Sequence, residues 1–317
     1  MQKNIKRLKS TILKVVISLL LITIVLARVD INGVVFSLSQ ANIYLYIFSF
    51  IILVTGQLIS SWRWKILLNA QGYRLSLMSA FRLYLTGFLL SFTLPTIIGG
   101  DFYKIYKLNS KQKIKKPTNI ILATIMDRAL GLYALLIIFT IAIILSPVFL
   151  FSQKLLLASI SILFTFLATL LFYKPGMLKK IPIFTTVISK TNLFDKIKLS
   201  VSLYNNNMSS IKQSLGLSFV FQLLSIFNQY MLFKVLYIKV SISAIFFAIP
   251  ITKIVQALPI SIGGIGVQEV SLFSLLGPHG ITLEQITSYS LLKYSMLILL
   301  TIIFSGYTLS KNSSFIK

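Results

Sequence analysis

Long apolar runs alternate with short polar stretches along nearly the whole chain. Six of these runs have about 20 residues, which is the length that an α-helix needs to cross the ~30 Å hydrocarbon core of a bilayer. Their continuous hydrophobicity favours helices over a membrane β-barrel, whose strands would alternate. The pattern predicts an all-α, polytopic transmembrane helix bundle, with full spans at about residues 11–27, 42–60, 118–145, 154–173, 214–236 and 285–309.

Two further apolar runs, at about residues 75–98 and 243–276, are interrupted. The first ends in LPTIIGGD (94–101) and the second contains LPISIGGIGVQE (258–269). Proline and glycine break helices, and non-helical backbone is tolerated at membrane depth only where protein or a water-filled cavity surrounds it. We therefore expect each run to form a re-entrant hairpin, in which a break separates two helices.

The composition agrees with a membrane protein and narrows the chemistry. Of the 317 residues 56% are hydrophobic and only 12% are charged, whereas soluble domains are roughly a quarter charged. The chain has no cysteine and a single histidine, His279. Thiolate sites and disulfides are therefore excluded, and we expect neither a metal nor a cofactor.

The basic residues predict an orientation. There are 31 Lys and Arg against 6 Asp and Glu, and the excess lies between the apolar runs. That distribution is the positive-inside bias of membrane proteins and not a nucleic-acid-binding surface. We expect the cytoplasmic membrane, both termini in the cytoplasm, and cytoplasmic positions for the basic residues Arg63, Lys65 and Arg74 and the loops 104–116 and 174–213.

With this orientation, the two broken runs open from opposite faces of the membrane. Their motifs share Leu-Pro and a glycine pair, and Gly99 and Gly263 lie about half the chain apart. An inverted repeat of broken helices is typical of transporters that bind substrate near the midplane. We expect one integral membrane domain, residues 1–317, with repeat halves 42–173 and 214–309 and a cytoplasmic loop 174–213.

Charged residues beside the breaks are the first candidates for function. Two of the six acidic residues, Asp101 and Glu269, stand next to the two breaks. Each acid either caps the helix that starts again after its break or lines a cavity, and one carboxylate can do both. Arg82 and Lys253, in the hairpin arms, either reach the membrane surface or hold an anionic headgroup.

A second kind of candidate lies inside an apolar run. Asp127 and Arg128 fall near the middle of residues 118–145. Charged residues at membrane depth usually face the bundle interior and pair. We expect either a structural ion pair with Asp101 or Arg82, or a contact with substrate. Lys293 and Glu284, close to the last span, either pair, reach the cavity or lie at a solvated rim, and the rim is the favoured interpretation.

The candidate substrate-binding residues share a position at a break or inside an apolar run, and no catalytic residue is assigned. They are Arg82, Pro95, Gly99, Gly100, Asp101, Lys104, Asp127, Arg128, Lys253, Pro259, Gly263, Gly264, Gly266 and Glu269.

The motifs resemble the transmembrane region of the lysylphosphatidylglycerol synthase/flippase family. Four stretches carry the resemblance in family order, over nearly the whole chain: SSWRWKILLNAQGYRLSLMSAFRLYLTGFLLSF, LPTIIGGDFYKIYKL, TIMDRALGLYALL and ALPISIGGIGVQEVSLFSLLGPHGITLEQITSYSLL. The family's GGD-x-x-R pattern has Lys104 in place of arginine here. Lysine keeps the charge but loses the bidentate fork of a guanidinium.

The resemblance implies a lipid-handling protein. Members fused to a cytosolic aminoacyl-transferase domain move aminoacylated phosphatidylglycerol between leaflets, and stand-alone relatives are linked to glycolipid or envelope polysaccharide pathways. Since the chain stops soon after the last span, we expect it to lack the synthase half. The expected function is a flippase-like lipid translocase in cell-envelope biogenesis. Its partners would be a membrane lipid (an anionic phospholipid or a polyprenyl-linked lipid), envelope-biosynthesis enzymes and a second copy of the chain.

Two other functions stay open. A membrane-embedded glycosyltransferase or lipid-modifying transferase would use Asp101 or Glu269 as general base on a polyprenyl-phosphate donor. The sequence offers it no large extramembrane domain and no paired-carboxylate metal motif. A non-catalytic partner of an envelope-assembly complex would use the basic loop 174–213 as its docking surface.

The predicted orientation can be checked by labelling single cysteines, because the chain has none of its own. Cysteines at Ser110 and at His279 should react with a membrane-impermeant maleimide from opposite sides of intact cells or vesicles. Labelling of both from the same side would rule out the inverted repeat.

Overall fold

A computed structural model describes residues 29–93, 99–112, 117–145, 157–165, 207–257 and 264–309, with the single residues 23, 27, 169, 199, 202, 204 and 261. Most of the predicted first span and most of the loop 174–213 lie outside these residues. So do Pro95, Pro259 and Gly263 at the centres of the two motifs.

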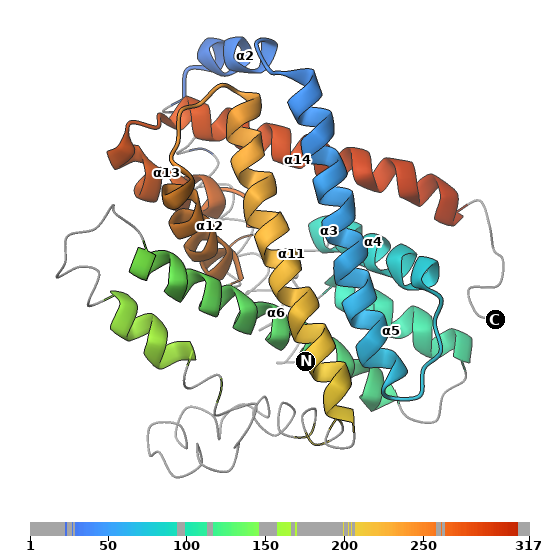
Figure 1. Cartoon of the computed structure of the whole chain (residues 1–317). Helices are drawn as coiled ribbons and strands as arrows, with labels where there is room; N and C mark the ends of the chain where they lie inside the picture. Colours follow the sequence, from blue (N-terminus) through green and yellow to red (C-terminus); the bar gives the residue numbers. More distant parts are fainter. Residues whose placement is uncertain are drawn as a thin grey trace, which may run out of the picture. The chain divides into compact units, whose positions relative to one another are not determined.

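The described residues form helices (Figure 1), which confirms the all-α prediction for this part of the chain. The labelled helices are α2 (Ile31–Ser39), α3 (Ile43–Asn69), α4 (Leu77–Thr93), α5 (Gly99–Gln112), α6 (Pro117–Leu145), α11 (Met208–Val235), α12 (Ile242–Ala257), α13 (Val267–Leu276), a 3-10 turn (Gly277–His279) and α14 (Leu283–Leu309).

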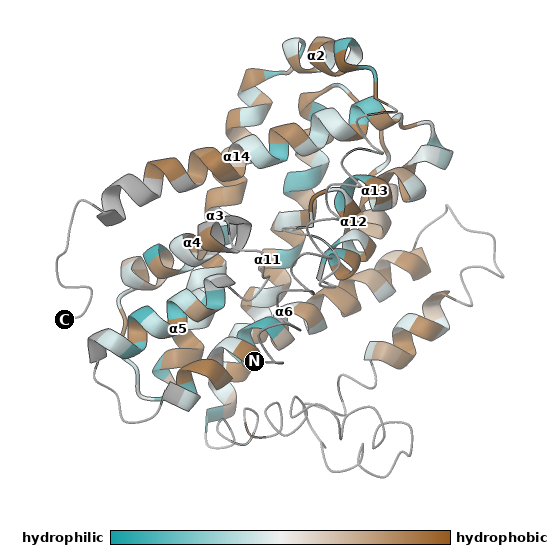
Figure 2. Cartoon of the chain, turned by 180° about the vertical axis from the view of Figure 1, so that it is seen from behind, coloured by the Kyte–Doolittle hydropathy of each residue, from teal (hydrophilic) through white to brown (hydrophobic). Residues whose placement is uncertain are grey.

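Among the described residues, three helices are long and apolar enough to cross a membrane, namely Ile43–Asn69, Thr118–Leu145 and Met208–Val235. These helices cover the predicted spans at 42–60, 118–145 and 214–236, and the prediction that these spans are helical is confirmed. The 27-residue helix α14 covers the predicted last span. Figure 2 shows hydrophobic residues along most of α6 and α14.

The chain divides into two compact units. Unit 1 comprises Met1–Gly56, Arg82–Lys104 and Leu224–Asn312; unit 2 comprises Gln57–Phe81, Ile105–Leu223 and Ser313–Lys317. Each unit takes a part of α3, α4, α5 and α11. Both predicted hairpin breaks belong to unit 1, and the Asp127-Arg128 pair belongs to unit 2. The predicted division into repeat halves stays a prediction.

The two helices that flank the first break pack closely against each other. A Cβ atom on Gly87 of α4 would lie 2.7 Å from the carbonyl oxygen of Gly100 and 3.0 Å from Cγ of Lys104. Three residues earlier on α4, the ring of Tyr84 lies 4.2 Å from Nζ of Lys104. Gly87 is close to the start of α5, whereas Tyr84, about one turn earlier on α4, is close to Lys104, about one turn later on α5. The two helices therefore run antiparallel, as expected for a hairpin.

Helix α5 corrects the prediction of a loop at residues 104–116. Residues 104–112 are helical and continue the second arm of the hairpin. Lys104 and Leu108 are buried one turn apart, while Phe102 and Tyr106 are exposed. The helix continues because its buried positions recur with helical spacing, so its lysines are not all loop residues.

The second hairpin consists of α12 and α13, which pack against each other (Figure 1). Between them, Gly264 and Gly266 have φ angles of +77° and +80°. Only glycine adopts this left-handed conformation without strain. The two glycines therefore form the turn that lets the chain reverse, and the predicted helix–break–helix arrangement is confirmed here.

The close contact of α4 with α5 gives a stability prediction. We expect Gly87→Ala to reduce the free energy of unfolding by about 1–3 kcal/mol, because the added methyl group meets backbone as well as a side chain. The measurement is thermal unfolding of the purified protein in detergent. Gly216→Ala is the matched control, because a Cβ there meets nothing within 4 Å. Equal stability of the two variants would contradict the close packing.

Candidate functional site

Glu269 holds the start of α13 in place after the second break. Its Oε2 accepts a hydrogen bond of 2.7 Å from the backbone N–H of Gly266. Its Oε1 accepts a hydrogen bond of 3.2 Å from the hydroxyl of Tyr294 on α14. A carboxylate at a helix N-terminus satisfies a backbone donor and interacts favourably with the helix dipole. The capping interpretation of Glu269 is thus confirmed, and its contact with substrate stays a prediction.

Gln268, beside Glu269, is fully buried and joins three helices. Its Oε1 accepts hydrogen bonds from Nε2 of Gln256 on α12, at 2.9 Å, and from Nζ of Lys293 on α14. Its Nε2 donates to Oγ of Ser290, at 2.9 Å. Because oxygen and nitrogen of the amide are both engaged, Gln268 has a fixed orientation. The prediction that Lys293 lies at a solvated rim is wrong, since its ammonium group reaches this buried amide.

Lys253 of α12 belongs to the same region of unit 1. Its Nζ donates a hydrogen bond of 2.8 Å to Oγ of Ser225 on α11. Lys293 lies near enough to interact electrostatically with both Lys253 and Glu269. We call this group the second-break cluster; its members are Lys253, Gln256, Gln268, Glu269, Ser290, Lys293 and Tyr294. It contains two lysines and one glutamate.

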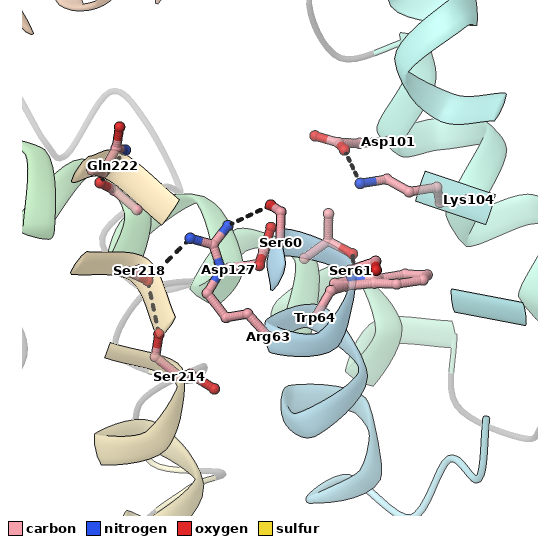
Figure 3. Close-up of polar contacts among 12 residues, drawn as sticks. Ser60, Ser61, Arg63, Trp64, Asp101, Lys104, Asp127, Ser214, Ser218 and Gln222 are labelled. Atoms are coloured by element: carbon pink, nitrogen blue, oxygen red, sulfur yellow. Dashed lines mark hydrogen bonds and ion pairs between the residues drawn. The ribbon is translucent and has the colours of Figure 1, made fainter. Parts of the chain in front are cut away.

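The first break has a simpler charge arrangement. Asp101, in the first turn of α5, places Oδ1 2.7 Å from Nζ of Lys104 (Figure 3). Both residues are buried, with 8% and 2% of their surface exposed. The ammonium group also lies over the ring of Tyr84. The pair is locally neutral, and the acid sits where a helix N-terminus favours negative charge. Arg82, half-buried on α4, lies further along the other arm.

Unit 2 contains a separate buried ion pair, between Arg63 and Asp127. Nε of Arg63 lies 2.6 Å from Oδ1 of Asp127, and Nη1 donates to Oγ of Ser218 at 3.0 Å (Figure 3). Arg63 is 3% exposed and Asp127 is 0% exposed. Gly131 leaves room for the guanidinium group, because a Cβ there would lie 3.2 Å from Nη1. The pair joins α3, α6 and α11.

This pair corrects three expectations. Arg63 lies inside α3 and is buried, so it is not a charge of a cytoplasmic loop. Asp127 pairs with Arg63, which was not among its expected partners. Arg128 is exposed, because consecutive residues of a helix point about 100° apart. Asp127 and Arg128 therefore do not act as one unit.

The structure brings several of the predicted site residues together and leaves others apart. Gly100, Asp101 and Lys104 meet at the first break, and Gly264, Gly266 and Glu269 meet at the second. Gln256, Gln268 and Tyr294 belong to the second-break cluster but are not among the site residues predicted from the sequence. Their signal was available, because amides within apolar runs are costly unless they are hydrogen-bonded. Within the described residues, no group of three or more His, Asp or Glu is placed to hold a metal ion.

Membrane-length apolar helices around buried polar clusters define a polytopic helical membrane protein. The chain belongs to the family described as the lysylphosphatidylglycerol synthase TM region, whose model matches residues 11–306. It is also similar to a UPF0104 membrane protein of Methanocaldococcus jannaschii, with 26% identity over 285 residues and 84% of each chain covered. The family resemblance found in the motifs is thereby confirmed.

The buried pair in unit 2 should be structural. We expect Asp127→Asn and Arg63→Met each to reduce the free energy of unfolding by about 3–5 kcal/mol, because each leaves a buried charge without its partner. The double variant Arg63→Met/Asp127→Leu should recover most of this loss. Thermal or denaturant unfolding in detergent measures it, with exposed Arg74→Met as the control. Additive losses in the double variant would contradict a structural pair.

Proposed function

We propose that this protein is a flippase-like lipid translocase, which moves a phospholipid or a polyprenyl-linked glycolipid between the leaflets of the cytoplasmic membrane. Its work would belong to cell-envelope biogenesis, and both termini would lie in the cytoplasm. Membership of the lysylphosphatidylglycerol synthase TM region family supports a role in lipid handling. The observation that carries the proposal is the second-break cluster, which places ammonium groups, a carboxylate and amides beside an interrupted helix.

A charged side chain inside an apolar helical protein is costly, and most such residues serve structure or function. Arg63 and Asp127 have a structural explanation, because they neutralise each other. The second-break cluster has a different character. Glu269 has a structural role, as the cap of α13. Lys253 and Lys293 bring positive charge to the break, where a headgroup needs polar contacts while its tails stay in lipid.

The first break supplies a second polar contact for the headgroup. Asp101 and Lys104 form a close pair that is buried in the absence of substrate. In the proposed cycle this pair opens. Lys104 then meets a headgroup phosphate, and Asp101 meets an amine of the lipid or takes a proton. A lysine suits this role because its ammonium group binds phosphate as a point charge.

The transferase alternative has less support. Glu269 already accepts hydrogen bonds from Gly266 and Tyr294, and Asp101 already faces Lys104. A general base needs a carboxylate oxygen within reach of the hydroxyl that it deprotonates. A translocase could also bind envelope-biosynthesis enzymes or a second copy of the chain through its surface, so these partners do not compete with the proposal.

Leaflet exchange in proteoliposomes tests the proposal. Fluorescent phospholipids and prenyl lipids in the inner leaflet should become accessible to an external quencher in the presence of the wild-type protein. We expect Asp101→Asn and Glu269→Gln to slow this exchange by about tenfold, roughly 1.4 kcal/mol. Gln still caps a helix, so the second variant removes charge and keeps the fold.

The matched control is Asp30→Asn, because Asp30 caps α2 and Asn caps equally well. Wild-type liposomes that match protein-free liposomes for every lipid class would contradict the proposal. Formation of product from a sugar or lipid donor, without leaflet exchange, would favour the transferase instead.

A further inference from the structure

Buried and half-buried cations of the described chain differ in the group that faces them. Arg63 lies 2.6 Å from Asp127, and Lys104 lies 2.7 Å from Asp101, so a carboxylate faces each of them directly. Lys293 instead donates to Oε1 of Gln268, which is a neutral amide oxygen. A neutral acceptor satisfies one hydrogen bond of an ammonium group but leaves its charge uncompensated.

The nearest acid does not cancel this charge by contact. Both oxygens of Glu269 accept hydrogen bonds from neutral donors, the N–H of Gly266 and the hydroxyl of Tyr294. Lys253 adds a second ammonium group within electrostatic range of Lys293. The cluster contains two lysines and one glutamate, so it carries one net positive charge when all three are ionised. An anion bound there would compensate it.

The second break also contains a buried hydroxyl group that makes no hydrogen bond. Ser261, between α12 and α13, is only 4% exposed, and its Oγ makes no hydrogen bond in the structure. A buried hydroxyl without a partner costs free energy that a ligand atom recovers on binding. An ammonium group together with a hydroxyl donor suits the oxygens of a phosphate group.

We infer that the second-break cluster is a phosphate-binding site that selects lipids with an anionic headgroup. Lys293 is the residue that contacts the phosphate, and Lys253 and Ser261 support it. Gln268 is a positioning residue, because its amide is fixed by Gln256 and Ser290 and in turn holds the ammonium group of Lys293. The assignment of the anion to a lipid rests on the proposed function. The second break then distinguishes anionic from neutral headgroups. The first break, with its neutral Asp101–Lys104 pair, does not distinguish them.

Binding of matched lipids to the full-length protein tests this inference. Fluorescent phosphatidylglycerol and phosphatidylcholine with identical acyl chains are titrated against purified protein in detergent micelles. The wild type should bind phosphatidylglycerol at least about tenfold more tightly, a difference of about 1.4 kcal/mol. Lys293→Met should abolish this preference. Lys239→Met, which removes the same charge at an exposed turn of unit 1, should leave it unchanged.

Gln268→Glu separates anion binding from a structural role. The substitution keeps the size of the side chain and places a carboxylate against the ammonium group of Lys293. We expect this variant to lose the preference for phosphatidylglycerol while it retains the thermal unfolding temperature of the wild type. It therefore tests the inference even if Lys293→Met fails to fold.

Competition with inorganic phosphate identifies the source of the anion. Displacement of phosphatidylglycerol only by anionic lipid assigns the site to a headgroup, and displacement by inorganic phosphate at similar concentration assigns it to the free ion. Either result supports the anion site.

Equal binding of phosphatidylglycerol and phosphatidylcholine by the wild type overturns the inference. A preference for phosphatidylglycerol that survives in both Lys293→Met and Gln268→Glu overturns it as well. Leaflet exchange without headgroup preference would overturn this inference and leave the translocase proposal standing.

Discussion

A helix that stops inside an apolar protein exposes backbone N–H groups that must find partners within the chain. Much of unit 1 follows from this constraint at the second break. The turn needs glycine at positions 264 and 266, and the restarted helix needs a cap, which Glu269 provides. The cap brings a charge into the interior, and the hydroxyl of Tyr294 on α14 orients it. The break, the acid and the neighbouring helix are therefore one physical unit.

Three groups of charged residues in the described part of the chain show how such a protein accommodates ions. In unit 2, Arg63 and Asp127 are buried together and stabilise the packing of α3, α6 and α11. At the first break, Asp101 and Lys104 neutralise each other within one turn of α5. In the second-break cluster two lysines accompany one glutamate, and the lysines donate hydrogen bonds to Ser225 and Gln268. An excess of buried charge is stable only where something compensates it, and this is why we place ligand selection there.

The sequence predicted the helices well, because runs of apolar residues about 20 long and breaks at Pro-Gly motifs are local signals. It also placed Asp101 and Glu269 beside helix starts. Pairing was harder to predict. Arg63 looked like a loop charge because two serines and two tryptophans surround it in the sequence, yet a partner 64 positions away holds it inside α3. Lys293 was likewise misplaced at a rim, because its partner Gln268 lies 25 positions away in the sequence. Hydrophobic periodicity carries no information on contacts between such distant positions.

Cross-linking from a lipid headgroup to the protein tests most directly whether the helix breaks handle the lipid. A phosphatidylglycerol analogue with a photoreactive group in its headgroup would be reconstituted with the full-length protein and illuminated, and the adducts located by peptide mass spectrometry. We expect adducts on α12, α13 and α14 close to Lys253 and Lys293, which unlabelled phosphatidylglycerol suppresses. Adducts confined to exposed positions such as Tyr44, which is 81% exposed, and insensitive to competing lipid would contradict the proposed site.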